Sequence, residues 1–105
     1  MRDPKRTPAQ RLAEAEARGG DAELWEFAAL LAEHRGQSDT AAISNAVEAI
    51  VSLARCHATW MAGLFTWSSE DPHVEYRAAT GNPSREDHYA RLVRIHRAVY
   101  KPRKQ

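Results

Sequence analysis

The sequence has little of what several classes of protein depend on. One cysteine, Cys56, stands among 105 residues, so no internal disulfide can form and we expect a cytoplasmic protein. No apolar run approaches the ~18 residues that a transmembrane helix needs, and no apolar segment follows the charged first residues. We therefore predict neither a membrane span nor a secretory signal. Val and Ile together number only eight, too few for a convincing sheet.

Motifs for the common catalytic and cofactor sites are also missing. The chain has no Gly-rich phosphate loop, no Walker motif, no nucleophile elbow and no paired carboxylates in a catalytic pattern. These gaps favour a protein that is not an enzyme and that needs no cofactor.

Alanine is abundant, with 19 residues, and Ala has the highest helix propensity of any residue. We predict an all-α fold: a small bundle of about four main helices and one short extra helix. A single helical domain at 9–101 would follow a flexible basic arm at 1–8 and precede a basic tail at 102–105. Capping residues and glycines place the predicted helices at 8–18, 21–35, 39–66, 72–79 and 84–100.

The long helix predicted at 39–66 carries an apolar stripe with an average spacing of 3.5 residues, which is typical of a bundle seam. Its members are Ile43, Val47, Ile50, Ala54, His57, Met61 and Leu64. Only Glu48 and Arg55 carry charge between Thr40 and Ser69. A helix with so few charges is covered on most sides, so we expect it to form the interface of a homo-oligomer.

Charge is distributed unevenly behind a formal total of +1. Residues 21–50 hold six acids and one base, whereas residues 81–105 hold seven bases and two acids. On a helical wheel one arc of the last helix gathers four basic residues: Arg91, Arg94, Arg97 and Lys101. Clustered arginines suit phosphate, so this arc predicts contact with nucleic acid or another phosphate-bearing ligand. The alternatives are a solvated face and ion pairs, either with Glu26 and Glu33 of the second helix or with a neighbouring subunit.

Three tryptophans are many for so short a chain, and Trp is common at the centre of protein interfaces. We predict that Trp25, Trp60 and Trp67 contribute to a partner interface, and packing within the chain is the alternative. An adaptor or inhibitor that binds a protein partner through the acidic helix and these tryptophans is the second functional hypothesis.

Three of the five histidines, His34, His57 and His96, fall on apolar helix faces. Neutral imidazoles that converge in a bundle can bind zinc, but no spaced metal motif accompanies them. We therefore expect separate core or boundary histidines and no metal. Protonation of His57 near its ordinary pKa would make assembly through the seam sensitive to pH.

Arg91 and His96 spell R-x4-H, which is similar to the active-site motif of HEPN ribonucleases. That resemblance, over six residues, implies a dimeric helical bundle in which the Arg and His act on RNA phosphodiesters. On a wheel the two residues lie about 140° apart, so a surface Arg and a core His are the alternative. The main hypothesis is a small, non-enzymatic regulatory or binding protein of the kind that mobile elements encode, with the ribonuclease as a further alternative.

Overall fold

The fold is all-α in the computed structural model, which describes residues 6–64, 66 and 71–100. Within these residues the chain forms five helices and no strand. They are α1 (Pro8–Arg18), α2 (Ala22–His34), α3 (Thr40–Met61), α4 (His73–Thr80) and α5 (Arg85–Val99). The predicted all-α class is confirmed. Most of the predicted basic arm and all of the predicted tail lie outside the described residues.

Local sequence explains where two of the helices begin. At α1 the Thr7 hydroxyl accepts a hydrogen bond from the Gln10 N–H, and the Gln10 side chain accepts one from the Thr7 N–H. This reciprocal pair satisfies two backbone donors that the first helical turn would otherwise leave without partners. At α5 the Ser84 hydroxyl accepts a hydrogen bond from the Asp87 N–H. Both starts agree with the sequence prediction.

The long helix is shorter than predicted: α3 ends at Met61 rather than Thr66. Gly63 has a φ of +79°, a left-handed conformation that Gly adopts without steric cost. The Gly63 N–H donates to the Trp60 carbonyl and the Leu64 N–H donates to the Thr59 carbonyl. This pair of hydrogen bonds satisfies the last carbonyls and ends the helix. The predicted extension to Thr66 was therefore wrong, because the helix-ending role of Gly63 was not taken into account.

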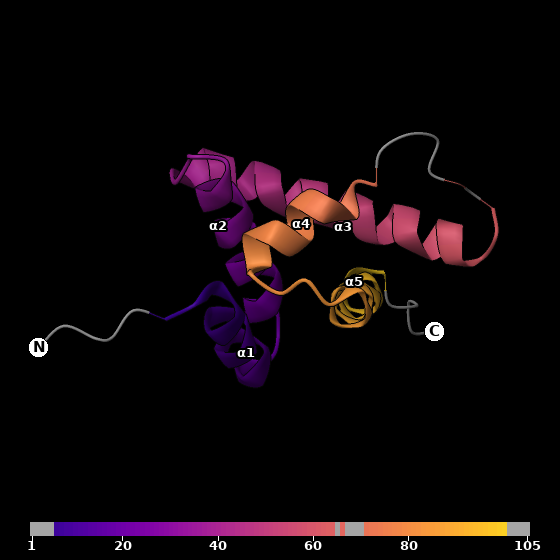
Figure 1. The fold of residues 1–105 in the computed structure, drawn as a ribbon, viewed down its shortest axis with the longest axis horizontal. Coiled ribbons are helices and arrows are strands. Elements are labelled where there is room, and N and C mark those ends of the chain that lie inside the picture. The colour runs from indigo at the N-terminus through magenta and orange to yellow at the C-terminus, as the bar shows by residue number, and fades with distance from the viewer. Residues whose placement is uncertain (1–5, 65, 67–70, 101–105) are drawn as a thin grey trace, which may run out of the picture.

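Helix α2 lies at the centre of the fold and packs against α1, α3 and α4, while α5 packs against α3. Figure 1 shows α3 along one edge of the molecule, with α2 and α5 both below it in that view. Phe27 of α2, Ile50 of α3 and Leu92 of α5 are fully buried and join one core cluster. This arrangement places the start of α2 beside the middle of α5.

The apolar seam of α3 is buried only in its middle. Ile50, Ala54 and His57 are buried as predicted, and Ile43 and Val47 pack partly against the core. Two further seam residues stay in solvent: Met61 is 65% exposed and Leu64, beyond the end of the helix, is 80% exposed.

Candidate functional site

A buried carboxylate joins α2 to the basic helix α5. Glu23 Oε2 accepts hydrogen bonds from Arg91 Nε at 2.7 Å and from Arg94 Nη2 at 2.7 Å. Arg94 Nε donates to the other carboxylate oxygen at 3.3 Å, and Arg94 Nη2 also lies 3.6 Å from Glu16. Burial alone would raise the pKa of Glu23, but the hydrogen bonds from Arg94 and Arg91 outweigh it and lower the pKa.

This network reduces the charge that the predicted phosphate-binding residues can present to a ligand. Arg91 is only 9% exposed, and both Arg91 and Arg94 carry ion pairs within the chain. Arg97, in contrast, is exposed and forms no ion pair with any residue in the described ranges. Lys101, the fourth predicted residue, lies outside the described residues. Among the three predicted residues that the structure describes, Arg97 alone is exposed and forms no ion pair with another described residue.

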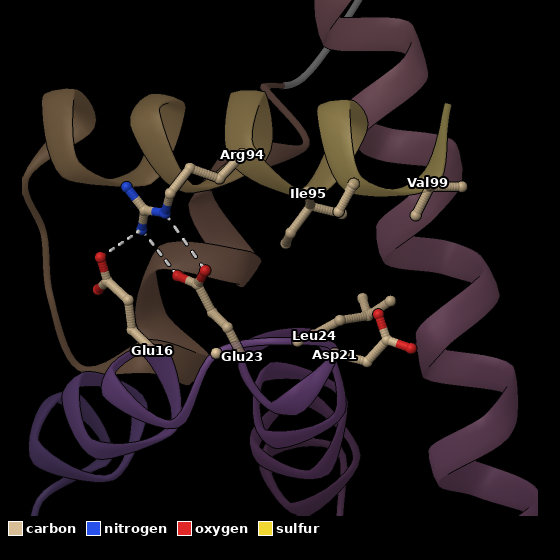
Figure 2. A pocket seen from close by; sticks show the side chains of 10 residues that line it. Glu16, Asp21, Glu23, Leu24, Arg94, Ile95 and Val99 are labelled. Atoms are coloured by element: carbon tan, nitrogen blue, oxygen red, sulfur yellow. Dashed lines mark hydrogen bonds and ion pairs between the residues drawn. The ribbon is translucent and has the colours of Figure 1, made fainter. Parts of the chain in front are cut away.

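A cavity of about 200 Å³ opens beside the Glu23 network (Figure 2). One wall is apolar and comes from α2 and α5; it includes Leu24, Ile95 and Val99. The polar wall carries three carboxylates and one guanidinium, from Glu16, Asp21, Glu23 and Arg94. Acids outnumber bases at this cavity, and Arg94 already points to two of them in Figure 2. The local field therefore opposes a phosphate at Arg94.

The acidic residues Glu26 and Glu33 of α2 also form ion pairs within the chain. Arg11 of α1 donates from Nε to Glu26 at 2.7 Å and from its two terminal nitrogens to Glu33 at 3.0 and 3.1 Å. The bidentate geometry fits the planar guanidinium fork, and the hydrogen bonds to Glu33 and Glu26 raise the pKa of Arg11. Glu26 and Glu33 thus pair with Arg11, not with the basic helix as the alternative prediction had it.

The end of α5 combines charge with aromatic surface. The His96 ring lies 4.8 Å from the Tyr100 ring, and the guanidinium carbon of Arg55 lies 5.5 Å from the Tyr100 ring centre. Tyr100 is 41% exposed. No hydrogen bond or ion pair joins Arg91 to His96 in the described part of the chain. Instead, Arg91 contacts Glu23 and His96 contacts Tyr100.

Three helices contribute histidines to a buried cluster that the sequence did not reveal. His57 of α3, His73 of α4 and His88 of α5 are 1–2% exposed. His73 Nδ1 lies 2.8 Å from His88 Nε2, so one nitrogen donates a hydrogen bond and the other accepts it. The His57 ring lies 5.5 Å from His73 and 4.6 Å from Tyr89.

The three histidines that the sequence places on apolar faces lie in different surroundings: His34 is exposed, His57 is buried and His96 is half-buried. His73 and His88 were missed because each is brought into the cluster by packing between helices, which leaves no spacing motif in the sequence. Among the described residues, no group of three His, Cys, Asp or Glu side chains is placed to hold a metal.

Burial sets the protonation of this cluster. It lowers the pKa of His57, and it lowers that of His73 against the opposing charge of Asp71. For His88, burial together with the positive potential of His73, Arg77 and Arg91 lowers the pKa to about 3. All three rings are therefore neutral at pH 7.

The predicted interface tryptophans lie in different surroundings. Trp25 of α2 is 46% exposed. Trp60 is half-buried, with its ring 5.5 Å from His57 and 5.9 Å from Tyr89. Trp67 lies outside the described residues.

Comparison with known proteins adds no relative. No family model matches the chain, and no curated protein and no solved structure is significantly similar to it. Across the described ranges, no helix is both long and apolar enough to cross a bilayer.

Proposed function

We propose that this chain is a small, non-enzymatic binding protein that contacts nucleic acid through the C-terminal end of α5. The observation that carries the proposal is the exposed guanidinium of Arg97, which forms no ion pair with any other residue that the structure describes. Ion pairs with Glu23 already occupy Arg91 and Arg94, so these two arginines hold α5 on α2 and offer little charge to a ligand.

The sequence beyond Arg97 supports the same surface. Residues 97–105 contain four basic residues and no acidic residue: Arg97, Lys101, Arg103 and Lys104. Clustered basic residues bind the phosphate backbone by releasing its counterions, and the affinity then falls steeply with salt. Tyr100, partly exposed, adds an aromatic surface next to this charge. Nucleic acid is favoured over a small phosphate ligand because the four charges follow one another along the chain, as the phosphates of a nucleic-acid backbone do.

The test is fluorescence anisotropy with labelled oligonucleotides at 50 and 200 mM salt, comparing wild type with Arg97→Glu. We expect the wild type to bind at low salt. The variant should bind at least about fivefold more weakly, with the slope of affinity against salt reduced by ~1. Arg85→Glu is the matched control, since Arg85, at the other end of α5, is exposed and forms no ion pair within the described part of the chain. Absence of binding at 50 mM salt, or equal binding by Arg97→Glu, would refute the proposal.

One observation favours a second candidate, a protein–protein adaptor: the large exposed ring of Trp25. The acidic part of that hypothesis has less support, because Glu26 and Glu33 are paired with Arg11. A chain that ignores nucleic acid at both salt concentrations would favour this candidate.

Self-association and a cytoplasmic location belong to the same proposal. A dimer would double the number of basic ends that one nucleic acid can contact, and so raise the apparent affinity.

A further inference from the structure

The cavity between the start of α2 and the end of α5 has an apolar wall large enough to hold part of an organic molecule. Figure 2 shows Ile95 and Val99 on α5 above Leu24 on α2, and these three side chains form that wall. The cavity volume is about 200 Å³. A cavity of ~150 Å³ can hold benzene, so this one has room for about six to eight non-hydrogen atoms. Burial of a hydrocarbon group against this wall would be favourable.

Most of the charge around the cavity is paired within the chain. Arg94 forms ion pairs with Glu16 and Glu23. Arg91 also pairs with Glu23, so the formal charges of these four residues sum to zero. Asp21 is exposed, and its carboxylate forms no hydrogen bond or ion pair with another residue that the structure describes. In Figure 2 it lies on the side of Leu24, away from Arg94, so one negative charge remains beside the apolar wall.

These charges select the class of ligand. The N-terminus of α2 would by itself favour an anion through the helix dipole. Three carboxylates on the polar wall oppose an anion, and the one guanidinium on that wall is already paired. An ammonium group can form a charge-assisted hydrogen bond with Asp21 while a short hydrocarbon chain covers Leu24 and Val99. We propose that this cavity binds a small primary alkylamine, with Asp21 as the partner of its ammonium group.

The inference goes beyond the proposed function and does not depend on it, because Arg97 is not part of the cavity wall. Failure of nucleic-acid binding would leave the amine site standing, and failure of amine binding would leave the nucleic-acid surface standing. A ligand with six non-hydrogen atoms buries little surface, so we expect a Kd on the order of a millimolar.

The experiment is a two-dimensional ¹H–¹⁵N NMR titration of the full chain with pentylamine, whose amino group is protonated at pH 7. Pentylamine should shift the amide signals of residues 19–24 and 94–99 together. Two probes of the same length test the charge: 1-pentanol has none, and pentanoate has the opposite sign. Each should bind at least about fivefold more weakly than pentylamine.

Variants test the two walls separately. Asp21→Asn keeps the size of the side chain and removes its charge, so it should weaken pentylamine binding at least about fivefold and leave 1-pentanol binding unchanged. Asp39→Asn is the matched control, because Asp39 is also an exposed residue at a helix N-cap and its side chain makes no capping hydrogen bond. Val99→Thr makes the apolar wall more polar, so it should weaken pentylamine but not methylamine, which lacks the chain.

Several results would overturn the inference. Pentanoate or 1-pentanol that binds wild type as tightly as pentylamine would refute the charge preference, and this comparison needs no variant. Shifts spread over every exposed carboxylate, equal pentylamine binding by wild type and Asp21→Asn, or no shift at tens of millimolar pentylamine would each refute the site. Unchanged 1-pentanol binding in Asp21→Asn shows that the cavity itself is intact, so a loss of amine binding then reports the lost charge.

Discussion

Acid should unfold this protein earlier than its carboxylates alone would require, because His88 is neutral in the fold. Its pKa falls from the ordinary 6.5 to about 3 through burial and nearby positive charge. The unfolded chain therefore binds a proton at His88 near pH 6.5, whereas the folded chain does not. The free energy of unfolding is at its full value above pH 6.5 and declines as the pH falls below it. At pH 5, which is 1.5 pH units below the pKa of His88 in the unfolded chain, His88 alone should lower the free energy of unfolding by about 2 kcal/mol.

The neighbouring histidines act in the same direction. Burial lowers the pKa of His57 and His73, so each adds to the loss of stability below pH 6.5. The 2.8 Å contact between His73 and His88 reinforces this, since two protonated rings would turn two N–H groups toward each other. The carboxylate of Glu23 contributes little in this window. The pKa of Glu23 lies below 4.5, so its stabilising charge is lost only at more acidic pH.

The assay is urea unfolding at pH 8 and pH 5 for wild type and His88→Leu. The wild-type free energy of unfolding should fall by at least about 2 kcal/mol between the two pH values, and the fall should be about 2 kcal/mol smaller in the variant. His34→Gln, at an exposed position, should keep the wild-type pH dependence. Equal wild-type stability at both pH values, or an NMR titration of His88 centred near pH 6.5, would refute the reasoning.

Two further predictions concern the buried network and the core. Glu23→Gln removes the negative charge that Arg91 and Arg94 share. Chemical denaturation at pH 7 should therefore show a free energy of unfolding lower by about 3 kcal/mol. A decrease below about 0.5 kcal/mol would mean that the network does not stabilise the fold. The Phe27 ring is 0% exposed and packs edge-on against Tyr76 and His88. Phe27→Ala removes this ring and should lower the free energy of unfolding by about 3–5 kcal/mol. A melting temperature unchanged by this substitution would contradict that placement of Phe27.

Much of the fold could be predicted from the sequence because its signals are local. The capping box at Thr7 and the cap at Ser84 involve residues three apart in the chain, so they can be recognised without knowing what packs nearby. The end of α3 was predicted wrongly, but its cause is also local. Gly63, whose left-handed conformation ends the helix, can be read directly from the sequence.

The candidate site was harder to predict because its parts are distant in sequence. Glu23 lies 68 residues from Arg91, and nothing near either residue indicates that they meet. The basic arc of α5 is visible in the sequence, but the pairing of Arg91 and Arg94 with Glu23 is not.

The sequence by itself determined the helical class, most helix boundaries and the imbalance of charge, since these follow from propensity, capping and composition. Only the tertiary structure decided which charges remain available. Packing brings Glu23 to Arg91 and leaves Arg97 exposed, and it gathers His57, His73 and His88 into one buried cluster. Ion pairing and burial depend on distances between helices, and those distances are set by how the apolar faces pack together.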